Sequence, residues 1–329
     1  MNRLACVITS SLAFAGCALD NPDPTAPTAD PTTEQTDAPA AATASAIKHV
    51  FVIAMENHAT SSIYGSTHAP YINNTLIPAF GRATGLVDTI TSLPSEPHYV
   101  WMEAGTNAFS DHTFSTDNNP SSSNSTASTA HLSTQITAAG STWLSYQEGL
   151  NTTTGACPIA ASGEYAPKHD PFIFFRDVSG ATPSKTNATC AAHHKALTAL
   201  ATDLANNTVA AYNFITPNLC DDMHDSCSPT NDPITQGDTW LSLNMPALIT
   251  YANAHQGVVF VLWDEPEGTT GNIPLLVVGP NVKPNFASTV RYTQGSLVKS
   301  VEAILGLPTL AKVSGDNVFS DFFNAGFFP

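Results

Sequence analysis

Basic residues are scarce in this chain of 329 residues, which has 11 Lys and Arg against 27 Asp and Glu and a formal net charge of −16 at pH 7. A nucleic-acid-binding protein needs the opposite balance, so that class is excluded. Charged residues are only 12% of the chain and apolar residues are 42%, which excludes an intrinsically disordered protein. The body of the chain also lacks a long apolar run, which excludes a polytopic membrane protein. An anionic ligand would have to be bound by local positive charge, such as a metal ion, histidines or helix N-termini.

The first 17 residues indicate an export signal. A single positive charge at Arg3 precedes a short apolar stretch, Leu4–Ala15, which is too short to span a membrane. Small residues stand just before Cys17, as in a bacterial lipobox, although Phe14 replaces the usual leucine. We therefore expect an exported cell-surface or periplasmic lipoprotein acylated at Cys17, with simple secretion as the alternative.

The rest of the chain divides into a linker and one domain. Residues 18–46 are mostly Ala, Thr and Pro, which predicts a disordered tether that forms no core. Residues 47–329 are enough for a single domain that buries roughly three quarters of its unfolded surface.

Four cysteines remain in this domain. An even number in an exported protein indicates two disulfides. Cys220 and Cys227 bracket a short acidic segment and are expected to pair, and Cys157 is then expected to pair with Cys190. A zinc site is the alternative, although the spacing fits no structural zinc pattern.

Four continuous apolar runs predict strands that are buried on both faces, as in a parallel sheet. They cover residues 48–55, 211–215, 257–263 and 273–278. Between and after them the pattern predicts helices over residues 193–206, 240–254 and 296–305, the last ended by Gly306. This alternation indicates a doubly wound α/β domain with a mostly parallel sheet and helices on both faces.

Acidic and amide side chains follow three of these strands, where ligands bind in such sheets. The residues concerned are Glu56 and Asn57, then Asp222, His224 and Asp225, and finally Asp264 and Glu265. Each acid alone could merely cap a following helix or loop. Together, their oxygens and the imidazole favour a divalent cation.

A serine also stands at the start of a short predicted helix. Residues 95–104 predict a helix with Ser95 as its N-cap and Gly105 as its end. The free N–H groups there favour an anion, so the Ser95 hydroxyl could attack phosphorus while the backbone holds the phosphate. Taken alone, Ser95 is better explained as a cap, and the absence of a Gly-x-Ser-x-Gly elbow weakens an ordinary esterase.

Seven short motifs occur in one order along the chain. They are Met55–Asn57, Ala69–Asn73, Pro94–Tyr99, Gly163–Phe172, Asp221–Asp225, Gln236–Leu241 and Trp263–Glu265. The set resembles the bacterial phosphoesterase family of secreted acid phosphatases and phospholipases C, which belongs to the alkaline phosphatase superfamily. The likeness spans about residues 48–310 and is greatest to the compact acid phosphatases, including those that act on phosphoinositides.

The resemblance implies a role for each matching residue. Ser95 corresponds to the family's nucleophile, with His224 or His169 as the group that protonates the leaving alkoxide. The positions that match its metal ligands are Glu56, Asn57, Asp264 and Glu265, and those around the phosphate are His98, Asp222 and Asp225. The alternative for His169 and Asp225 is a supporting or surface role.

Two residues depart from the family pattern. Many relatives have Asn at the position of His98, where an amide contacts phosphate. A histidine could donate the same bond, or bind phosphate through its charge at low pH. Many also have a histidine near Gln294, where members with two metals keep a ligand. Because glutamine is a poorer ligand, we expect one divalent metal ion rather than two.

The resemblance therefore implies an exported, metal-dependent phosphatase that hydrolyses phosphate monoesters of small molecules or phospholipid headgroups through a phosphoserine. One alternative is a phospholipase C-type phosphodiesterase. Another is a non-catalytic surface binding protein, which His98 and Gln294 would permit. The Ser/Thr/Asn-rich segment 110–134 would line the pocket of a diesterase or form a solvated insertion, and we favour the insertion.

Overall fold

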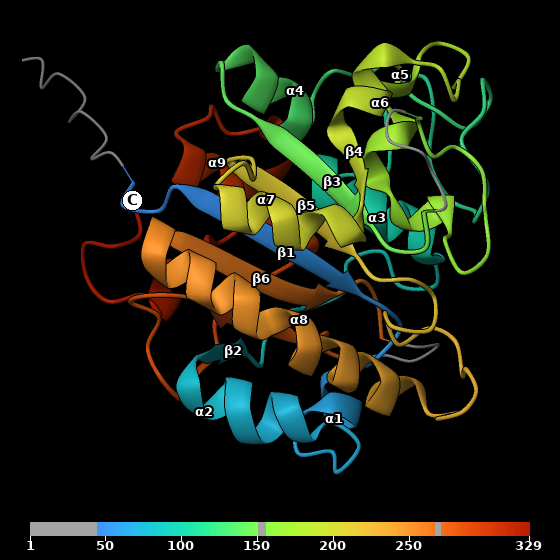
Figure 1. Ribbon diagram of the computed structural model, residues 1–329. Helices are drawn as coiled ribbons and strands as arrows, with labels where there is room; N and C mark the ends of the chain where they lie inside the picture. Colours follow the sequence, from blue (N-terminus) through green and yellow to red (C-terminus); the bar gives the residue numbers. More distant parts are fainter. Residues whose placement is uncertain (1–44, 151–155, 267–270) are drawn as a thin grey trace, which may run out of the picture. The chain divides into compact units, whose positions relative to one another are not determined.

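The computed structural model describes residues 45–150, 156–266 and 271–329, and Figure 1 shows how they are arranged. The expected signal peptide, residues 1–17, and residues 18–44 of the expected linker lie outside the described residues. The described residues form one domain around an eight-stranded sheet with the order β4-β3-β5-β1-β6-β7-β2-β8. Among them, no helix combines the length and the apolar character that crossing a membrane requires.

The strands are short and mostly parallel. They are β1 His49–Met55, β2 Gly81–Ala83, β3 Trp143–Gln147, β4 His194–Ala196, β5 Tyr212–Thr216, β6 Gly257–Trp263, β7 Leu275–Val278 and β8 Phe286–Ser288. The predicted strands 48–55, 211–215 and 257–263 are β1, β5 and β6, and they are parallel neighbours at the centre of the sheet.

The predicted strand 273–278 exists as β7, but its expected parallel direction is wrong. β7 pairs antiparallel with β6 on one side and with β2 on the other, and it alone among the described strands runs against the rest. All four of its residues are buried. A continuous apolar run reports burial on both faces, and burial does not specify the direction of the strand.

Helices lie on both sides of the sheet: α7 and α8 cover one face, and α9 lies behind the other (Figure 1). The α-helices are α1 Thr60–Ile63, α2 Ile77–Ala79, α3 Ser95–Ala104, α4 Leu132–Ala138, α5 Arg176–Ser179, α6 Ala188–His193, α7 Leu200–Asn206, α8 Pro233–His255 and α9 Gln294–Leu305. Shorter or irregular turns are η1 Ile72–Leu76, η2 Pro167–His169, η3 Pro171–Phe174, η4 Leu197–Ala199, η5 Ala311–Val313 and η6 Phe319–Phe322. The doubly wound α/β architecture is therefore confirmed.

Three of the four predicted helices are confirmed and one is broken; residues 95–104 form α3. Residues 240–254 lie within α8, and 296–305 within α9, which Gly306 ends in the left-handed conformation with φ of 67°. The expected helix 193–206 is instead the end of α6, strand β4, turn η4 and α7. β4 forms because these residues pair with β3 at the sheet edge, which overrides their local helical preference.

Both expected disulfides are present, Cys157–Cys190 and Cys220–Cys227. The zinc alternative is wrong, because a thiol held in a disulfide cannot bind zinc as a thiolate. The first bridge ties the segment before η2 to α6, and the second closes a short loop after β5.

Candidate active site

Three acidic residues follow three neighbouring strands, and the sheet brings them to one edge. β5, β1 and β6 are adjacent and parallel, so their carboxyl ends lie side by side. Glu56 donates its backbone N–H to the carbonyl of Asp222 (2.8 Å), and Asp264 donates its own to the carbonyl of Met55 (3.0 Å). The side chains of all three acids are fully buried. Such a concentration of interior carboxylates is costly unless something compensates their charge.

Several side-chain atoms at this edge are buried and have no hydrogen-bond partner. They are Glu56 Oε1, Asn57 Oδ1, His169 Nε2, Asp222 Oδ2, Asp264 Oδ2 and Gln294 Oε1. Buried polar atoms in proteins are nearly always paired, so this set indicates a site for a group that is not part of the chain. Carboxylate and amide oxygens with one imidazole nitrogen are a fitting donor set for a divalent cation.

The ligand atoms fall into two groups that could each hold a metal ion. The first group is Glu56, His169 and Asp222, and the second is His98, Asp264 and Glu265. Within each group the ligand atoms lie within 4.8 Å of one another. The residues predicted as metal ligands are thus divided between the groups. Asn57 links them, because its backbone N–H donates to Asp264 Oδ1 (3.0 Å).

His169 lies between two of these carboxylates. Its Nε2 is 3.2 Å from Glu56 Oε1, and its Nδ1 is 3.2 Å from Asp222 Oδ2. The ring stacks on Tyr99 with the ring centroids 4.9 Å apart. Burial lowers the pKa of His169 well below its ordinary value, and two nearby basic groups lower it further. A neutral His169 offers a lone pair either to a cation or to a proton.

Crowding in the interior also shifts the pKa values of the carboxyl groups. Burial raises the pKa of Glu56, Asp222 and Asp264 above their ordinary values, and for Glu56 the charges of the other two add to the effect. Burial raises the pKa of Glu265 to about 7, and the charge of Asp264 adds to it. A cation among these groups would reverse the direction of these shifts and allow the carboxylates to be fully ionised.

Ser95 is the first residue of α3, not its N-cap as predicted. The cap position is Pro94, which provides no side-chain acceptor, and the backbone N–H of Glu96 donates instead to Asp117 Oδ1 (3.0 Å). The Ser95 hydroxyl is therefore not used to cap the helix, and it donates to Glu56 Oε2 (2.9 Å). The hydroxyl thus lies against the carboxylate cluster.

The segment 110–134 is exposed along much of its length, as expected of the solvated insertion that we favoured, but it also makes buried contacts. Asn124 within it is buried, and its Nδ2 donates to Glu96 Oε2 (3.1 Å). The same Glu96 oxygen accepts a hydrogen bond from the N–H of Asn118 (2.7 Å). The segment therefore braces the first turn of the helix that carries Ser95. Its polar composition gave no sign of this, because its contacts are made with a distant part of the chain.

His98 already uses both of its ring nitrogens. Nδ1 donates to the carbonyl of Pro94 (2.8 Å), and Nε2 donates to Asp88 Oδ1 (3.1 Å). Burial opposes the charge on the ring, but the hydrogen bond to Asp88 and the negative charge of Asp264 raise the pKa of His98 to about 9. In this arrangement the ring can contact a phosphate only by giving up one of these bonds. Asp88, which holds it, was not anticipated from the sequence.

Gln294 occupies the place where the family pattern has a histidine, and it contacts the same cluster. Its Nε2 donates to the carbonyl of Asp264 (2.9 Å), while its buried Oε1 has no hydrogen-bond partner. Gln294 is the first residue of α9. Its amide nitrogen therefore supports the chain at Asp264, and its oxygen belongs to the unpaired set at this edge of the sheet.

His224 and Asp225 lie at the more exposed side of the cluster. His224 Nδ1 donates to Asp225 Oδ1 (2.7 Å), and the His224 ring centroid is 5.8 Å from that of His169. The backbone N–H of His224 donates to Asp222 Oδ1 (2.8 Å). The side chain of His224 is 27% exposed, so its ring borders both the buried acids and the solvent.

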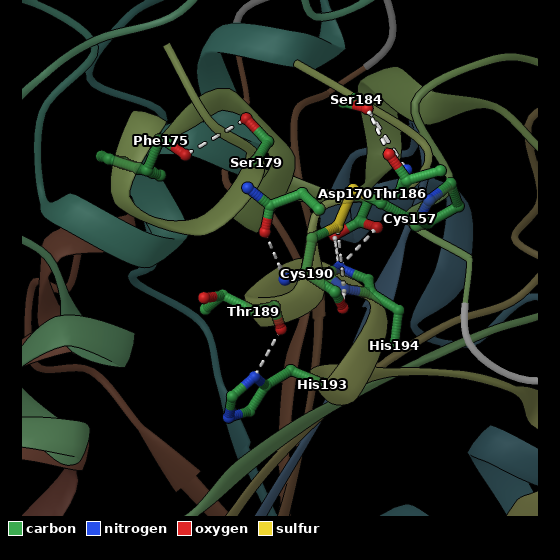
Figure 2. Close-up of a disulfide and its surroundings, with 12 residues drawn as sticks. Cys157, Asp170, Phe175, Ser179, Ser184, Thr186, Thr189, Cys190, His193 and His194 are labelled. Carbon is green, nitrogen blue, oxygen red and sulfur yellow. Dashed lines mark hydrogen bonds and ion pairs between the residues drawn. A yellow bond between two sulfur atoms is a disulfide. The ribbon is translucent and has the colours of Figure 1, made fainter. Parts of the chain in front are cut away.

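A disulfide and a buried ion pair lie at Asp170, the residue after His169, and Figure 2 shows them together. His194 Nδ1 donates to the carbonyl of Cys190 (2.7 Å), and the sulfur of Cys190 forms the disulfide with Cys157. His194 Nε2 donates to Asp170 Oδ1 (3.2 Å). Asp170 joins η2 to η3, so this chain of contacts restrains the backbone next to His169.

Comparison with known proteins identifies the family. The model of the phosphoesterase family matches residues 82–308, which is most of the domain. The chain belongs to the phosphoesterase family. It is therefore a phosphoric ester hydrolase, and the predicted family and class of enzyme are confirmed.

Two curated relatives are similar along much of the chain. The phosphatidylinositol-3-phosphatase of Mycobacterium tuberculosis is 28% identical over 262 residues, which are 79% of this chain and 77% of the relative. The phosphate-repressible acid phosphatase of Penicillium chrysogenum is 28% identical over 240 residues, which are 67% of this chain and 51% of the relative. The chain thus spans about half the length of the fungal protein.

A solved structure carries the same fold. The phosphonate monoester hydrolase of Silicibacter pomeroyi aligns with a TM-score of 0.51 and 11% identity, over 84% of this phosphoesterase and 76% of that chain. This likeness shows that the two proteins share the fold of the sheet and its helices.

Proposed function

We propose that this phosphoesterase is an exported, metal-dependent phosphatase that hydrolyses phosphate monoesters through a phosphoserine at Ser95. The observation that carries the proposal is the hydrogen bond from the Ser95 hydroxyl to Glu56 Oε2 (2.9 Å), beside buried ligand atoms that have no partner within the chain. The names of the two curated relatives support a phosphatase. The substrates that we propose are phosphorylated small molecules and phospholipid headgroups.

Ser95 is well placed to act as the nucleophile. Glu56 accepts its hydrogen bond and so orients the hydroxyl, and α3 begins at Ser95, so the positive end of the helix lies at the nucleophile. In the first step the Ser95 oxygen bonds to phosphorus, and the bond from phosphorus to the leaving oxygen breaks. Phosphoryl transfer depends mainly on such positioning and on charge stabilisation.

Glu56, Asn57, Asp264 and Glu265 would hold one divalent metal ion, as the family resemblance implies. Three of these residues each present a buried oxygen without a partner, which supports the assignment. When bound, the ion would lower the pKa of the Ser95 hydroxyl and offset the negative charge of the substrate.

His224 would donate a proton to the leaving alkoxide. Its position between the buried cluster and solvent suits a group that meets the leaving part of a substrate, and Asp225 orients its ring. His169, neutral and buried beside Asp222, would help to hold the phosphate side of the cluster in place. Water would then attack phosphorus, the bond to the Ser95 oxygen would break, and phosphate would leave.

Export through residues 1–17, a linker over 18–46 and acylation of Cys17 remain part of the proposal. The two disulfides support it, because such bonds persist in oxidising compartments outside the cytosol. Loss of palmitate labelling in Cys17→Ala would bear out the lipid anchor, whereas an unlabelled wild type would refute it.

The decisive experiment is hydrolysis of p-nitrophenyl phosphate beside bis-p-nitrophenyl phosphate from pH 4 to 9, with and without EDTA. Chelator-sensitive release from the monoester is the expected result. Preference for the diester would instead indicate a phospholipase C-type enzyme. Phosphate binding without release from either ester, in folded protein supplied with divalent metals, would indicate a binding protein.

A further inference from the structure

The candidate site is rich in carboxylates, yet its substrate would carry two negative charges. A bound divalent ion would balance part of that charge, and the histidines near the cluster are either neutral, as His169 is, or already engaged, as His98 is. A monoester dianion would therefore gain from one more cation close to the nucleophile.

Lys168 supplies a cation at this place. It lies in η2, between Pro167 and His169, and η2 packs against the nucleophile helix α3. Burial raises the pKa of Glu56 and of Asp222, and the charge of Lys168 acts on both in the opposite direction. The side chain of Lys168 is 22% exposed, so its ammonium group is reachable from solvent.

A single carboxylate holds both Lys168 and the nucleophile helix. Asp117 Oδ2 lies 2.7 Å from Lys168 Nζ, and Asp117 Oδ1 accepts the backbone N–H of Glu96 (3.0 Å). Glu96 follows Ser95 directly. The ammonium group is thereby fixed relative to the start of α3, where the Ser95 hydroxyl donates to Glu56.

We propose that Lys168 binds a non-bridging oxygen of the substrate's phosphate, that Asp117 is its positioning residue, and that this pair favours monoesters over diesters. The proposal rests on the proposed phosphatase function and extends it to substrate choice. A monoester presents a dianion, and a diester presents a monoanion. The same ammonium group therefore gains more from the monoester at equal geometry.

Lys168→Met in the full-length protein tests the binding role. We expect kcat/KM for p-nitrophenyl phosphate to fall about 100-fold, the size found when one donor to a developing oxyanion is removed, and that for bis-p-nitrophenyl phosphate to fall less than about tenfold. Lys168→Arg keeps the charge and should recover most of the loss. Equal losses for the two esters would overturn the proposal.

The chain offers a matched control in Lys195. Its Nζ lies 2.7 Å from Asp203 Oδ2, the same separation as in the Lys168 pair. Lys195 lies on β4 and Asp203 on α7. Lys195→Met should leave kcat/KM for both esters within about twofold of wild type, because that pair borders no site residue. An equal loss in Lys195→Met and Lys168→Met would show a general effect of removing a surface lysine and would overturn the proposal.

Two substitutions of Asp117 separate its role in positioning Lys168 from its role in capping α3. Asp117→Asn keeps an oxygen for the Glu96 N–H but loses the charge that holds Lys168, so KM for the monoester should rise about tenfold with little change in melting temperature. Asp117→Ala removes the cap as well and should also lower the melting temperature. If Asp117→Asn left KM unchanged, the positioning role would be wrong.

Binding of inorganic phosphate, measured by calorimetry with divalent metal present, gives a readout that needs no turnover. We expect the dissociation constant to weaken at least about tenfold in Lys168→Met and to be unchanged in Lys195→Met. If wild type hydrolyses neither ester, the proposed function fails, yet this comparison still decides the role of Lys168. An unchanged phosphate affinity in Lys168→Met would overturn it.

Discussion

Two buried histidines in this domain each lie between two carboxylates, and they differ in what is left unpaired. His131 donates one hydrogen bond from Nδ1 to Glu103 Oε1 (3.0 Å) and another from Nε2 to Asp177 Oδ2 (3.1 Å). His169 approaches Glu56 and Asp222 to 3.2 Å, but its Nε2 and the facing oxygens have no hydrogen-bond partner. Both ring nitrogens of His131 are thus hydrogen-bonded, although Glu103 Oε2 has no partner, and we call this group the closed network. The group around His169, with an unpaired ring nitrogen and unpaired facing oxygens, is the open network.

The difference also appears in the direction of the pKa shifts. Burial opposes the charge on His131, but hydrogen bonds to Asp177 and Glu103 raise its pKa above the ordinary value. Burial lowers the pKa of His169. His131 thus serves as a cation that joins α3, α5 and the start of α4, whereas His169 remains neutral beside unbalanced acids. The comparison teaches that a histidine with both ring nitrogens hydrogen-bonded is suited to a structural role, and one with an unpaired nitrogen beside unpaired acids is suited to binding a further group.

The largest expected effect is a difference in kcat between variants of two serines, Ser95 in the open network and Ser133 in the closed one. Ser95→Ala should lower kcat for the monoester by about 10⁴-fold or more, because no other hydroxyl would receive the phosphoryl group. Ser133→Ala, which removes a hydroxyl 3.0 Å from His131 Nδ1, should leave kcat within about twofold. Rates measured on folded protein, with labelling of Ser95 by a phosphorylated substrate, provide the test. Full activity in Ser95→Ala would refute the nucleophile.

Removal of metal is the next test of the open network. Since the carboxylates at Glu56, Asp222 and Asp264 repel one another, a bound divalent ion should stabilise the fold by about 4 kcal/mol at a free concentration of a thousand times Kd. EDTA should therefore lower the melting temperature and the rate together. Asp264→Asn should bind less metal and lose most of this response. A melting temperature that stayed constant while metal was stripped and lost from the protein would contradict the assignment.

Exchange of each histidine sharpens the contrast further. His169→Asn should lower kcat/KM by about 100-fold with little loss of stability, because the ring makes no completed hydrogen bond to the acids beside it. His131→Asn should change the activity of the folded protein little and should lower its stability instead. Kinetics and chemical unfolding of both variants provide the measurement. The idea fails if His169→Asn is the one that unfolds.

The smallest expected effect is the pH dependence of the closed network. Because the folded pKa of His131 is raised, its contribution is fully present below the unfolded value near 6.5 and is lost as the pH rises through the folded value. His131→Gln should cost about 3 kcal/mol at pH 5.5, since it leaves Glu103 and Asp177 without their cation, and clearly less at pH 9. Urea unfolding at the two pH values measures this. An equal cost at both would show that the charge on His131 is irrelevant.

Much of the fold followed from the sequence because parallel strands leave a strong signal. The runs that became β1, β5 and β6 are apolar at nearly every position, and the acids after them had to meet once the strands were neighbours. The short strand His194–Ala196 could not be foreseen, because only its pairing with β3 makes it a strand. The direction of β7 was hidden for the same reason.

The details of the site were less predictable, since they depend on contacts between distant segments. A serine before a helix is expected to cap it. Here Asp117, 21 residues beyond Glu96, accepts the Glu96 N–H, so the Ser95 hydroxyl does not cap the helix. Lys168 likewise pairs with Asp117, which lies 51 residues away, and Asp88 pairs with His98, which lies 10 residues away. No local pattern or spacing records such pairings.

The segment that carries Asp117 also matters to anyone who would rebuild this protein. Loops rich in Ser, Thr and Asn are the usual places to insert a tag, shorten a chain or graft a foreign peptide. Here Asn118, Asn124 and Asp117 all fasten onto the first turn of α3. A graft in this segment would disturb the placement of the reactive hydroxyl. The segment looks replaceable from its composition but is a poor place for an insertion.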